Sequence, residues 1–474
     1  MVPTALGTTE RCLTTPAPAG RRRYSVGDTR TDARVRRASK DRDATLLGRY
    51  VLPNTGVSGC AKRAIEEQDG TVKPIEVRCD DEAGAYLTGV RFCSSPWFCP
   101  RCSPKVLYRR GQEIDRICRA VFDNGGSIFL LTLTVRHSSR DSAQRLVDFV
   151  MHALSKVLKG GRWTRLAKRL GYIGLTRVAE VTCSDASGYH PHIHAALCFD
   201  RKLTDAEYAH LLRKLRKWWV ELVADPKHGL GRTVVPHRAV DLREWVEAVD
   251  AVFDADGNEI SGTGEGHSPA RYLTKIGHGW GIGNELAGAN VKAAKGRSMN
   301  PAQLVSAWIS SHLAGNPDRR LEAVIKELFK ATKGRHMTHT SANLRKWVAE
   351  RTDDIDEVEK TDEELAHEDV GGEAVVEIDP EVYAWIDRLQ ARTDVLDGVE
   401  DSGLNGAVEA LRDRGMPVVI AYRPAAPESD RQPAPLIKFD RSWIHRRTGP
   451  VTCRASKPSA VIRRNRGGDD HGWR

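Results

Sequence analysis

Long apolar runs are missing from this sequence of 474 residues. The longest, "IFLLTLTV" at residues 128–135, is far shorter than the roughly 20 apolar residues that a membrane-spanning helix needs. The first residues, "MVPTALGTTERCLTTPAPAG", also lack the apolar segment of a secretory signal. We therefore expect a cytoplasmic protein that has no membrane partner.

Cysteine is scarce, and nucleotide-binding loops and internal repeats are absent. The 10 cysteines do not suggest a disulfide framework, and since cytoplasmic thiols stay reduced, some of them are candidate metal ligands. No segment resembles the GxxxxGK(S/T) loop that cradles nucleotide phosphates. The length and the 40% apolar content predict a globular chain of about three domains.

Acidic residues are outnumbered by basic ones. Lys and Arg (73) exceed Asp and Glu (63) by 10, and arginine is concentrated near both ends, in "GRRRYSVGDTRTDARVRRASKDR" and "RRTGPVTCRASKPSAVIRRNR". This excess favours a polyanionic partner. Basic tails that are merely solvated and disordered are the alternative interpretation.

Apolar periodicity predicts an α+β order in the middle of the chain. Residues 127–137 and the two halves of a hairpin, 172–184 and 189–199, are typical of strands, whereas residues 142–161 and 204–223 have helical spacing. We therefore predict an antiparallel sheet with flanking helices.

Composition divides the whole chain into seven parts. Residues 353–381 contain fourteen acidic residues and one lysine, which is typical of a linker or a solvated surface. The predicted parts are a basic, disordered leader (1–50), a Cys-rich segment (51–110), the α+β domain (111–290), a helical DNA-binding or accessory region (291–350), an acidic linker (351–380), a small C-terminal unit (381–445) and a basic tail (446–474).

Three histidines alternate at the start of the second hairpin strand, in "GYHPHIHAALCFD". Alternate residues of a strand point to one face, so His190, His192 and His194 project together. If the turn centres on Ala186, Glu180 lies opposite His192, whereas a slip of one residue would turn it away. Two imidazoles and a carboxylate suit a catalytic Mg²⁺ or Mn²⁺ better than a closed zinc site. Surface histidines on an ordinary hairpin are the alternative.

A candidate nucleophile follows in "ARYLTKIG", within the short helix expected at residues 268–281. Tyr272 and Lys275 are three positions apart and therefore share a helix face. A phenol with a pKa of about 10 is a poor nucleophile unless a nearby cation and a polarised phosphate assist it. Lys275 is the candidate cation, although a Tyr and a Lys at this spacing are common in structural helices.

The Cys-rich segment has the spacing of part of a structural zinc site. Cys93, Cys99 and Cys102 form a C-x5-C-x2-C pattern that includes the knuckle "CPRC". Three thiolates need a fourth ligand, and both Cys60 and Cys79 lie upstream. Ordinary buried cysteines are the alternative interpretation.

Taken together, "FLLTLTVRH", "RVAEVT", "HPHIHAAL" and "RYLTKIG" resemble, in this order, the motifs of HUH endonucleases. The resemblance is to rolling-circle replication initiators of small Gram-positive plasmids, and "GVRFCSSPWFCPRCSPKV" is similar to the Cys-rich stretch of their actinobacterial members. It covers roughly residues 55–285. It implies a ferredoxin-like nuclease core, and Cys60 fits it slightly better than Cys79 as the fourth zinc ligand.

The resemblance also implies roles for individual residues. His192 and His194 would be the paired metal ligands, Glu180 the third, and Tyr272 the nucleophile that becomes linked to a 5′-phosphate, with Lys275 beside it. Many relatives have a glutamate four residues before the tyrosine, but this sequence has Ser268 there. The sequence therefore leaves the termination residue open, with His190, Glu265 and Arg271 as accessory candidates.

The implied partners are the double-strand origin of a plasmid, single-stranded DNA, and a host helicase and polymerase. A helicase is needed because the chain has no nucleotide-binding loop of its own. Two alternatives remain open: a single-tyrosine transposase or relaxase that uses the same site, and a non-catalytic, zinc-containing DNA-binding regulator.

Overall fold

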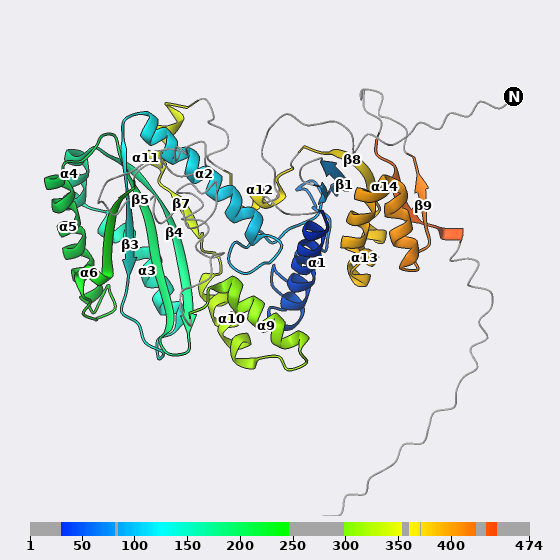
Figure 1. Cartoon of the computed structure of the whole chain (residues 1–474), viewed down its shortest axis with the longest axis horizontal. Coiled ribbons are helices and arrows are strands. Elements are labelled where there is room, and N and C mark those ends of the chain that lie inside the picture. The colour runs from blue at the N-terminus through cyan, green and yellow to red at the C-terminus, as the bar shows by residue number, and fades with distance from the viewer. Residues whose placement is uncertain are drawn as a thin grey trace, which may run out of the picture.

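The computed structural model describes residues 30–80, 84–245, 298–352, 360–369, 371–422 and 433–442. Two five-stranded sheets, each with its own buried core, lie at opposite ends of an elongated molecule (Figure 1). The predicted mixed α+β class is confirmed. No helix in these described ranges is long and apolar enough to cross a membrane.

The first sheet has the strand order β6-β3-β5-β4-β7, and every pair of neighbours is antiparallel. Its long members are β4 (Tyr172–Ser184) and β5 (Gly188–Phe199), which form the predicted hairpin, and β3 lies on the other side of β5. The strands are β3 (Ser127–Thr134), β4, β5, β6 (Val240–Trp245) and β7 (Thr338–Thr340).

The predicted hairpin register is confirmed, because Glu180 pairs with His192. Gly188 begins the return strand with φ of 74°, a conformation that residues with a Cβ rarely adopt. A Cβ at this position would also lie 2.8 Å from the carbonyl oxygen of Ser138. This turn therefore fixes the register that brings the acidic and imidazole side chains onto one face.

Helices cover the face of the first sheet opposite to the histidines. Phe129 of β3 packs against Phe199 of β5 and stacks on Tyr208 of α5, with ring centroids 5.7 Å apart in both pairs. Thr204 and Glu207 form a capping box that starts α5. The helices of this region are α3 (Ala143–Val157), α4 (Gly161–Leu170), α5 (Asp205–Ala224) and α6 (Pro236–Ala239). Helix α2 (Ser103–Asp123) instead lies near the histidine-bearing face, where its Ile114 lines a pocket with Thr176 of β4.

The second sheet combines strands from distant parts of the chain, in the order β2-β1-β8-β10-β9. Strand β1 comes from the Cys-rich segment and pairs with β8, which lies in the segment expected to be an acidic linker. That expectation needs correction, because the same segment also contains α12. The elements are β1 (Ile75–Asp80), β2 (Gly84–Thr88), α12 (Asp362–His367), β8 (Glu373–Ile378), α13 (Pro380–Leu389), α14 (Arg392–Asp413), β9 (Val418–Ala421) and β10 (Leu436–Phe439).

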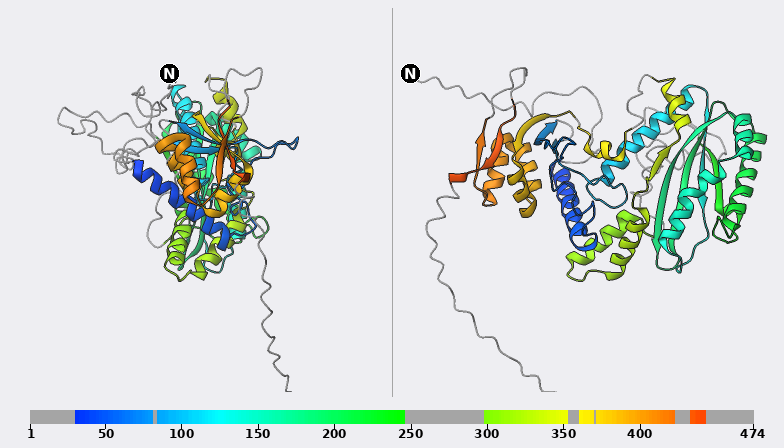
Figure 2. Two further views of the ribbon diagram at one scale, coloured as in Figure 1. Left: turned by 90° about the vertical axis from the view of Figure 1, so that its right-hand side faces the viewer. Right: turned by 180° about the vertical axis from the view of Figure 1, so that it is seen from behind.

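The predicted disordered leader also differs from the structure, because α1 (Arg30–Leu46) and the π-helix η1 (Leu47–Val51) lie within it. Arg34 and Arg37 form ion pairs with Glu400 of α14 at 3.0 and 2.7 Å. The basic face of α1 is therefore ordered by acidic residues more than 350 positions away. The right view of Figure 2 shows α1 lying between the two ends of the molecule.

Residues 298–352 are largely helical, as predicted, and contribute one strand to the first sheet. The edge strand β7 pairs with β4 near Arg177. The helices are α9 (Pro301–Leu313), α10 (Arg319–Thr332) and α11 (Ala342–Ala349).

Candidate metal centres

A carboxylate and two imidazoles meet on the open face of the first sheet. The Nε2 atom of His192 lies 2.7 Å from Oε2 of Glu180, and Nε2 of His194 lies 3.5 Å from the same oxygen. One potential ligand atom of each residue lies within 4.8 Å of those of the other two. Their side chains are 12 to 22% exposed, so the cluster is recessed but reachable.

Threonines of β3 orient the histidines from the neighbouring strand. Thr132 lies opposite His194 and its hydroxyl is 3.1 Å from Nδ1 of that ring, which leaves Nε2 directed toward Glu180. The hydroxyl of Thr134 is 2.7 Å from Nε2 of His190. A hydrogen bond to one ring nitrogen fixes which nitrogen is available as a ligand.

His190 lies beside the cluster without being part of it. Its ring stacks on His137 with centroids 4.5 Å apart, and Thr134 holds its Nε2. Burial and the neighbouring His192 and His137 rings lower the pKa of His190 to about 4, so it is neutral at physiological pH. His190 therefore remains a candidate accessory residue.

The electrostatics of the cluster favour an ionised carboxylate. Burial raises the pKa of Glu180, but hydrogen bonds to His192 and His194 outweigh it and lower the value to about 2. Nδ1 of His192 is buried and has no hydrogen-bond partner in the part of the chain that the structure describes. One carboxylate oxygen and two imidazole nitrogens converging at these distances fit a divalent cation with open coordination positions.

The predicted nucleophile and its neighbours fall outside the described residues. Tyr272, Lys275, Glu265 and Arg271 all belong to residues 246–297. The structure therefore brings together Glu180, His192 and His194 among the predicted catalytic residues.

Tyr189 is the tyrosine nearest to the histidines in sequence, and it lies on the opposite face of the sheet. Its hydroxyl donates a 2.6 Å hydrogen bond to Glu327 of α10, and its side chain is buried. Burial and Glu327 raise the pKa of Tyr189, which disfavours the nucleophilic phenolate.

We predict that Tyr189→Phe leaves unchanged the covalent DNA adduct that the resemblance to HUH endonucleases implies. The substitution removes one buried hydrogen bond, so we expect the protein to lose about 1 kcal/mol of stability. We expect no loss of adduct formation. Gel analysis of adducts on a single-stranded origin oligonucleotide, with a thermal melt beside it, checks both parts. Loss of the adduct in a folded variant would contradict the assignment of Tyr189 to packing.

Four cysteines form a second cluster, between the two sheets. Sγ of Cys60 lies 3.5 Å from that of Cys102 and 3.6 Å from that of Cys99, and Cys93 lies 3.7 Å from Cys102. Four sulfurs around a tetrahedral zinc, with bonds of about 2.3 Å, would be roughly 3.8 Å apart. Cys79 lies in β1, outside this cluster, so geometry selects Cys60.

Local structure explains how the cysteines converge. Cys102 is the N-cap residue of α2, and the backbone N–H of Ser103 donates to the carbonyl of Cys99, which closes the "CPRC" knuckle. Hydrogen bonds among the cluster sulfurs lower the pKa of Cys60 and raise those of Cys93 and Cys102, so the cluster by itself favours a single thiolate, at Cys60. The thiolate that this favours is the form that binds zinc.

Sequence reasoning missed the residues that support both clusters. In the sequence, Thr132 and Thr134 are polar residues that alternate within an apolar strand. This pattern is typical of any half-exposed strand and does not indicate that they contact histidines. Arg101, inside the knuckle, contacts Asp41 of α1 through a 2.7 Å ion pair that no local pattern indicates.

Comparison with known proteins gives a partial match. No protein-family model and no solved structure matches the chain. Protein rep of Streptomyces lividans is 26% identical over 255 residues, which cover 47% of this chain and 54% of that protein. The neomycin resistance protein of Streptomyces cyanogenus is 30% identical over 138 residues, which cover 24% of this chain and 32% of that protein.

The chain thus spans about half the length of the first relative and about a third of the second. The first match confirms the resemblance to Rep proteins that the sequence motifs indicate. The chain is a distant relative of Protein rep from Streptomyces lividans over about half of its length.

Proposed function

We propose that the protein initiates plasmid rolling-circle replication by nicking one strand of the origin. In this proposal Tyr272 keeps the 5′ end as a phosphotyrosine, and the free 3′-OH primes synthesis. The observation that carries the proposal is the convergence of Glu180, His192 and His194 on the open face of the sheet. The match to a Rep protein over about half the chain supports the same class of function.

The scissile phosphate would be activated beside Glu180, His192 and His194. Mg²⁺ or Mn²⁺ held by Glu180, His192 and His194 would supply Lewis-acid polarisation of a non-bridging phosphate oxygen. Glu180 stays ionised because its pKa is about 2, and Thr132 holds His194 in the orientation that directs Nε2 inward. These residues would hold the cation that positions the phosphate for in-line attack.

The covalent step exchanges one phosphate ester for another. The Tyr272 oxygen loses its proton and forms a bond to phosphorus, while the bond from phosphorus to the 3′ oxygen breaks and that oxygen takes up a proton. Lys275 balances the charge of the phenolate or of the transition state. Because the ester energy is conserved, rejoining needs no nucleotide cofactor. Glu265 remains the candidate for assisting termination, and Arg271 remains a candidate accessory residue.

The remaining parts of the chain serve DNA binding and partner recruitment in this proposal. The four-cysteine cluster holds a structural zinc, and the basic excess of 10 charges matches origin DNA. A host helicase and polymerase would unwind and extend the nicked strand, because the chain has no nucleotide-binding loop.

The test is to incubate the protein with a labelled single-stranded origin oligonucleotide and Mn²⁺ or Mg²⁺, and to look for an adduct that survives SDS. We expect a metal-dependent adduct and a released fragment that ends in a 3′-OH. Tight binding with no adduct under any metal would identify a non-catalytic regulator. Adduct formation on transposon-end or transfer-origin DNA alone would identify a transposase or relaxase.

A further inference from the structure

One peptide bond links the two hydrophobic cores of the molecule directly. Cys60, a member of the four-cysteine cluster, belongs to the core of the first sheet, and the next residue, Ala61, belongs to the core of the second. Both side chains are 1% exposed. Whatever holds this peptide therefore sets the position of one cluster sulfur relative to both cores.

Ala61 adopts a backbone conformation that is unfavourable for alanine. Its φ is 55°, in the left-handed region that the Cβ atom disfavours. Hydrogen bonds hold it there: its N–H donates to the carbonyl of Arg91 at 2.8 Å, and its carbonyl accepts from the hydroxyl of Tyr383 at 2.7 Å and from Arg392 at 2.8 Å. Tyr383 lies in α13 and Arg392 in α14, two helices that contribute to the core of the second sheet.

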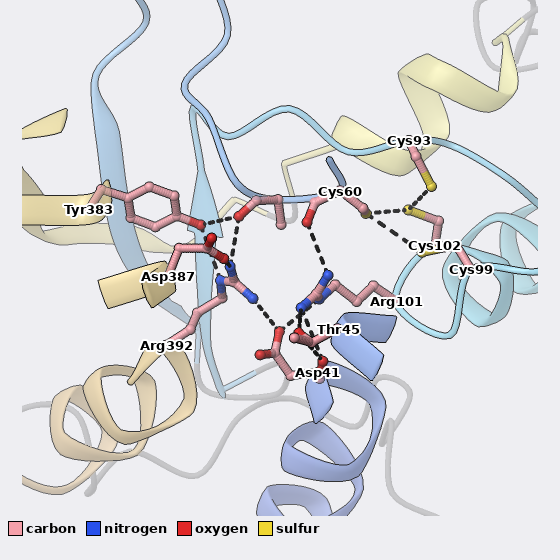
Figure 3. Close-up of polar contacts among 11 residues, drawn as sticks. Asp41, Thr45, Cys60, Cys93, Cys99, Arg101, Cys102, Tyr383, Asp387 and Arg392 are labelled. Atoms are coloured by element: carbon pink, nitrogen blue, oxygen red, sulfur yellow. Dashed lines mark hydrogen bonds and ion pairs between the residues drawn. The ribbon is translucent and has the colours of Figure 1, made fainter. Parts of the chain in front are cut away.

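The preceding carbonyl is held from the opposite side. Arg101, which lies between Cys99 and Cys102, donates from Nη1 to the carbonyl oxygen of Cys60 at 3.0 Å. The carbonyls of Cys60 and Ala61 are thus bound by two different arginines. Arg101 belongs to the cysteine knuckle, and Arg392 belongs to α14 beside the second sheet. Figure 3 shows the two guanidinium groups below this peptide, on either side of Asp41.

Asp41 joins the two arginines. Its Oδ1 accepts from Nε of Arg101 at 2.7 Å and also from Nη1 of Arg392. The arginine side chains are 7% exposed and Asp41 is 14% exposed, so the charges are held largely away from water. Such groups are stable only when paired, because loss of one partner leaves the others buried without compensation.

We propose that Arg392 and Tyr383 are positioning residues for the cysteine cluster, so that zinc affinity depends on the second sheet being packed in place. The inference rests on the proposal that the four cysteines bind zinc. Tyr383 and Arg392 hold the left-handed Ala61 and therefore also position the adjacent Cys60. Asp41 links Arg392 to Arg101, which lies in the knuckle between Cys99 and Cys102. By thermodynamic linkage, zinc in turn stabilises the second core.

The experiment measures zinc affinity of the full chain by competition with a chromogenic chelator, in the wild type, Arg392→Met and Tyr383→Phe. Arg414→Met is the matched control, since Arg414 caps the same helix α14 but its ion pair with Asp394 is much more exposed, with side chains 46% and 36% exposed. We expect at least tenfold weaker zinc binding in Arg392→Met, a smaller loss in Tyr383→Phe, and no change in Arg414→Met. Visible absorption of the Co²⁺-substituted proteins reports whether all four thiolates still bind.

The reciprocal measurement is hydrogen exchange. Removing zinc from the wild type should speed exchange of the amides of β8 and β10, and should do so less in Arg392→Met, where the coupling is already broken. If Arg392→Met does not fold, Tyr383→Phe decides, because it keeps the ring and removes one hydroxyl. Wild-type zinc affinity in folded Tyr383→Phe and in any folded Arg392→Met would overturn the inference, whereas a wild type without zinc would overturn the zinc proposal itself.

Discussion

His192→Ala and His194→Ala should each slow metal-dependent nicking at least a hundredfold, equivalent to about 2.7 kcal/mol of transition-state stabilisation. Each substitution removes one of the two imidazole nitrogens that lie within 3.5 Å of the Glu180 carboxylate. A cation held by the remaining pair would bind weakly and orient the phosphate poorly. His190→Ala should cause a milder loss, because Thr134 and His137 hold His190 beside the cluster.

Single-turnover nicking of a labelled oligonucleotide at several Mn²⁺ concentrations measures this effect. Binding of origin DNA should stay within a few-fold of wild type, since the fold does not depend on these partly exposed rings. His152→Ala is the matched control, because His152 is exposed on α3 and its ring bonds to the carbonyl of Asp148, away from the cluster. Wild-type nicking in either cluster variant would rule out His192 and His194 as the metal ligands.

Replacing both Cys99 and Cys102 with serine should remove about one zinc ion per chain and abolish folding or DNA binding. Structural zinc contributes on the order of 10 kcal/mol or more to the folded state, about as much as the whole stability of a typical domain. The cluster also lies where α1, α2 and the second sheet converge, so its loss affects both cores.

Elemental analysis and thermal unfolding test this prediction, and the structure offers a sharp comparison. Cys60→Ser should lose zinc, whereas Cys79→Ser should keep it, because Cys79 lies in β1 outside the cluster. A zinc-free protein that retains its fold and its origin affinity would contradict the structural zinc site. The four cysteines would then be ordinary buried core residues.

Features that depend on neighbours in sequence could be predicted well. The Glu180–His192 pairing followed from a short turn and strict alternation, because a two-stranded register is fixed once the turn is placed. Helices α3 and α5 likewise followed from apolar spacing that their own residues carry. Helix α4, between Gly160 and Gly171, was not predicted because it is only ten residues long, although its buried residues from Trp163 to Leu170 have helical spacing.

Features that depend on distant partners could not be predicted. Strand β8 lies within a strongly acidic segment, and its pairing with β1 joins residues about 300 positions apart. Helix α1 looked like a disordered basic tail, since the carboxylates that order it lie in α14. Cys60 and Cys79 could not be distinguished by spacing, because three-dimensional convergence alone decides which sulfur completes the cluster.

In the proposed mechanism, Tyr272 becomes covalently linked to the 5′ end of the nicked strand. Peptide mapping of the protein–DNA adduct by mass spectrometry identifies the linked residue. We expect the 5′-phosphate on the peptide that contains Tyr272, and no adduct in Tyr272→Phe although origin binding persists. A phosphate on any other residue, or an undiminished adduct in Tyr272→Phe, would contradict the proposed mechanism.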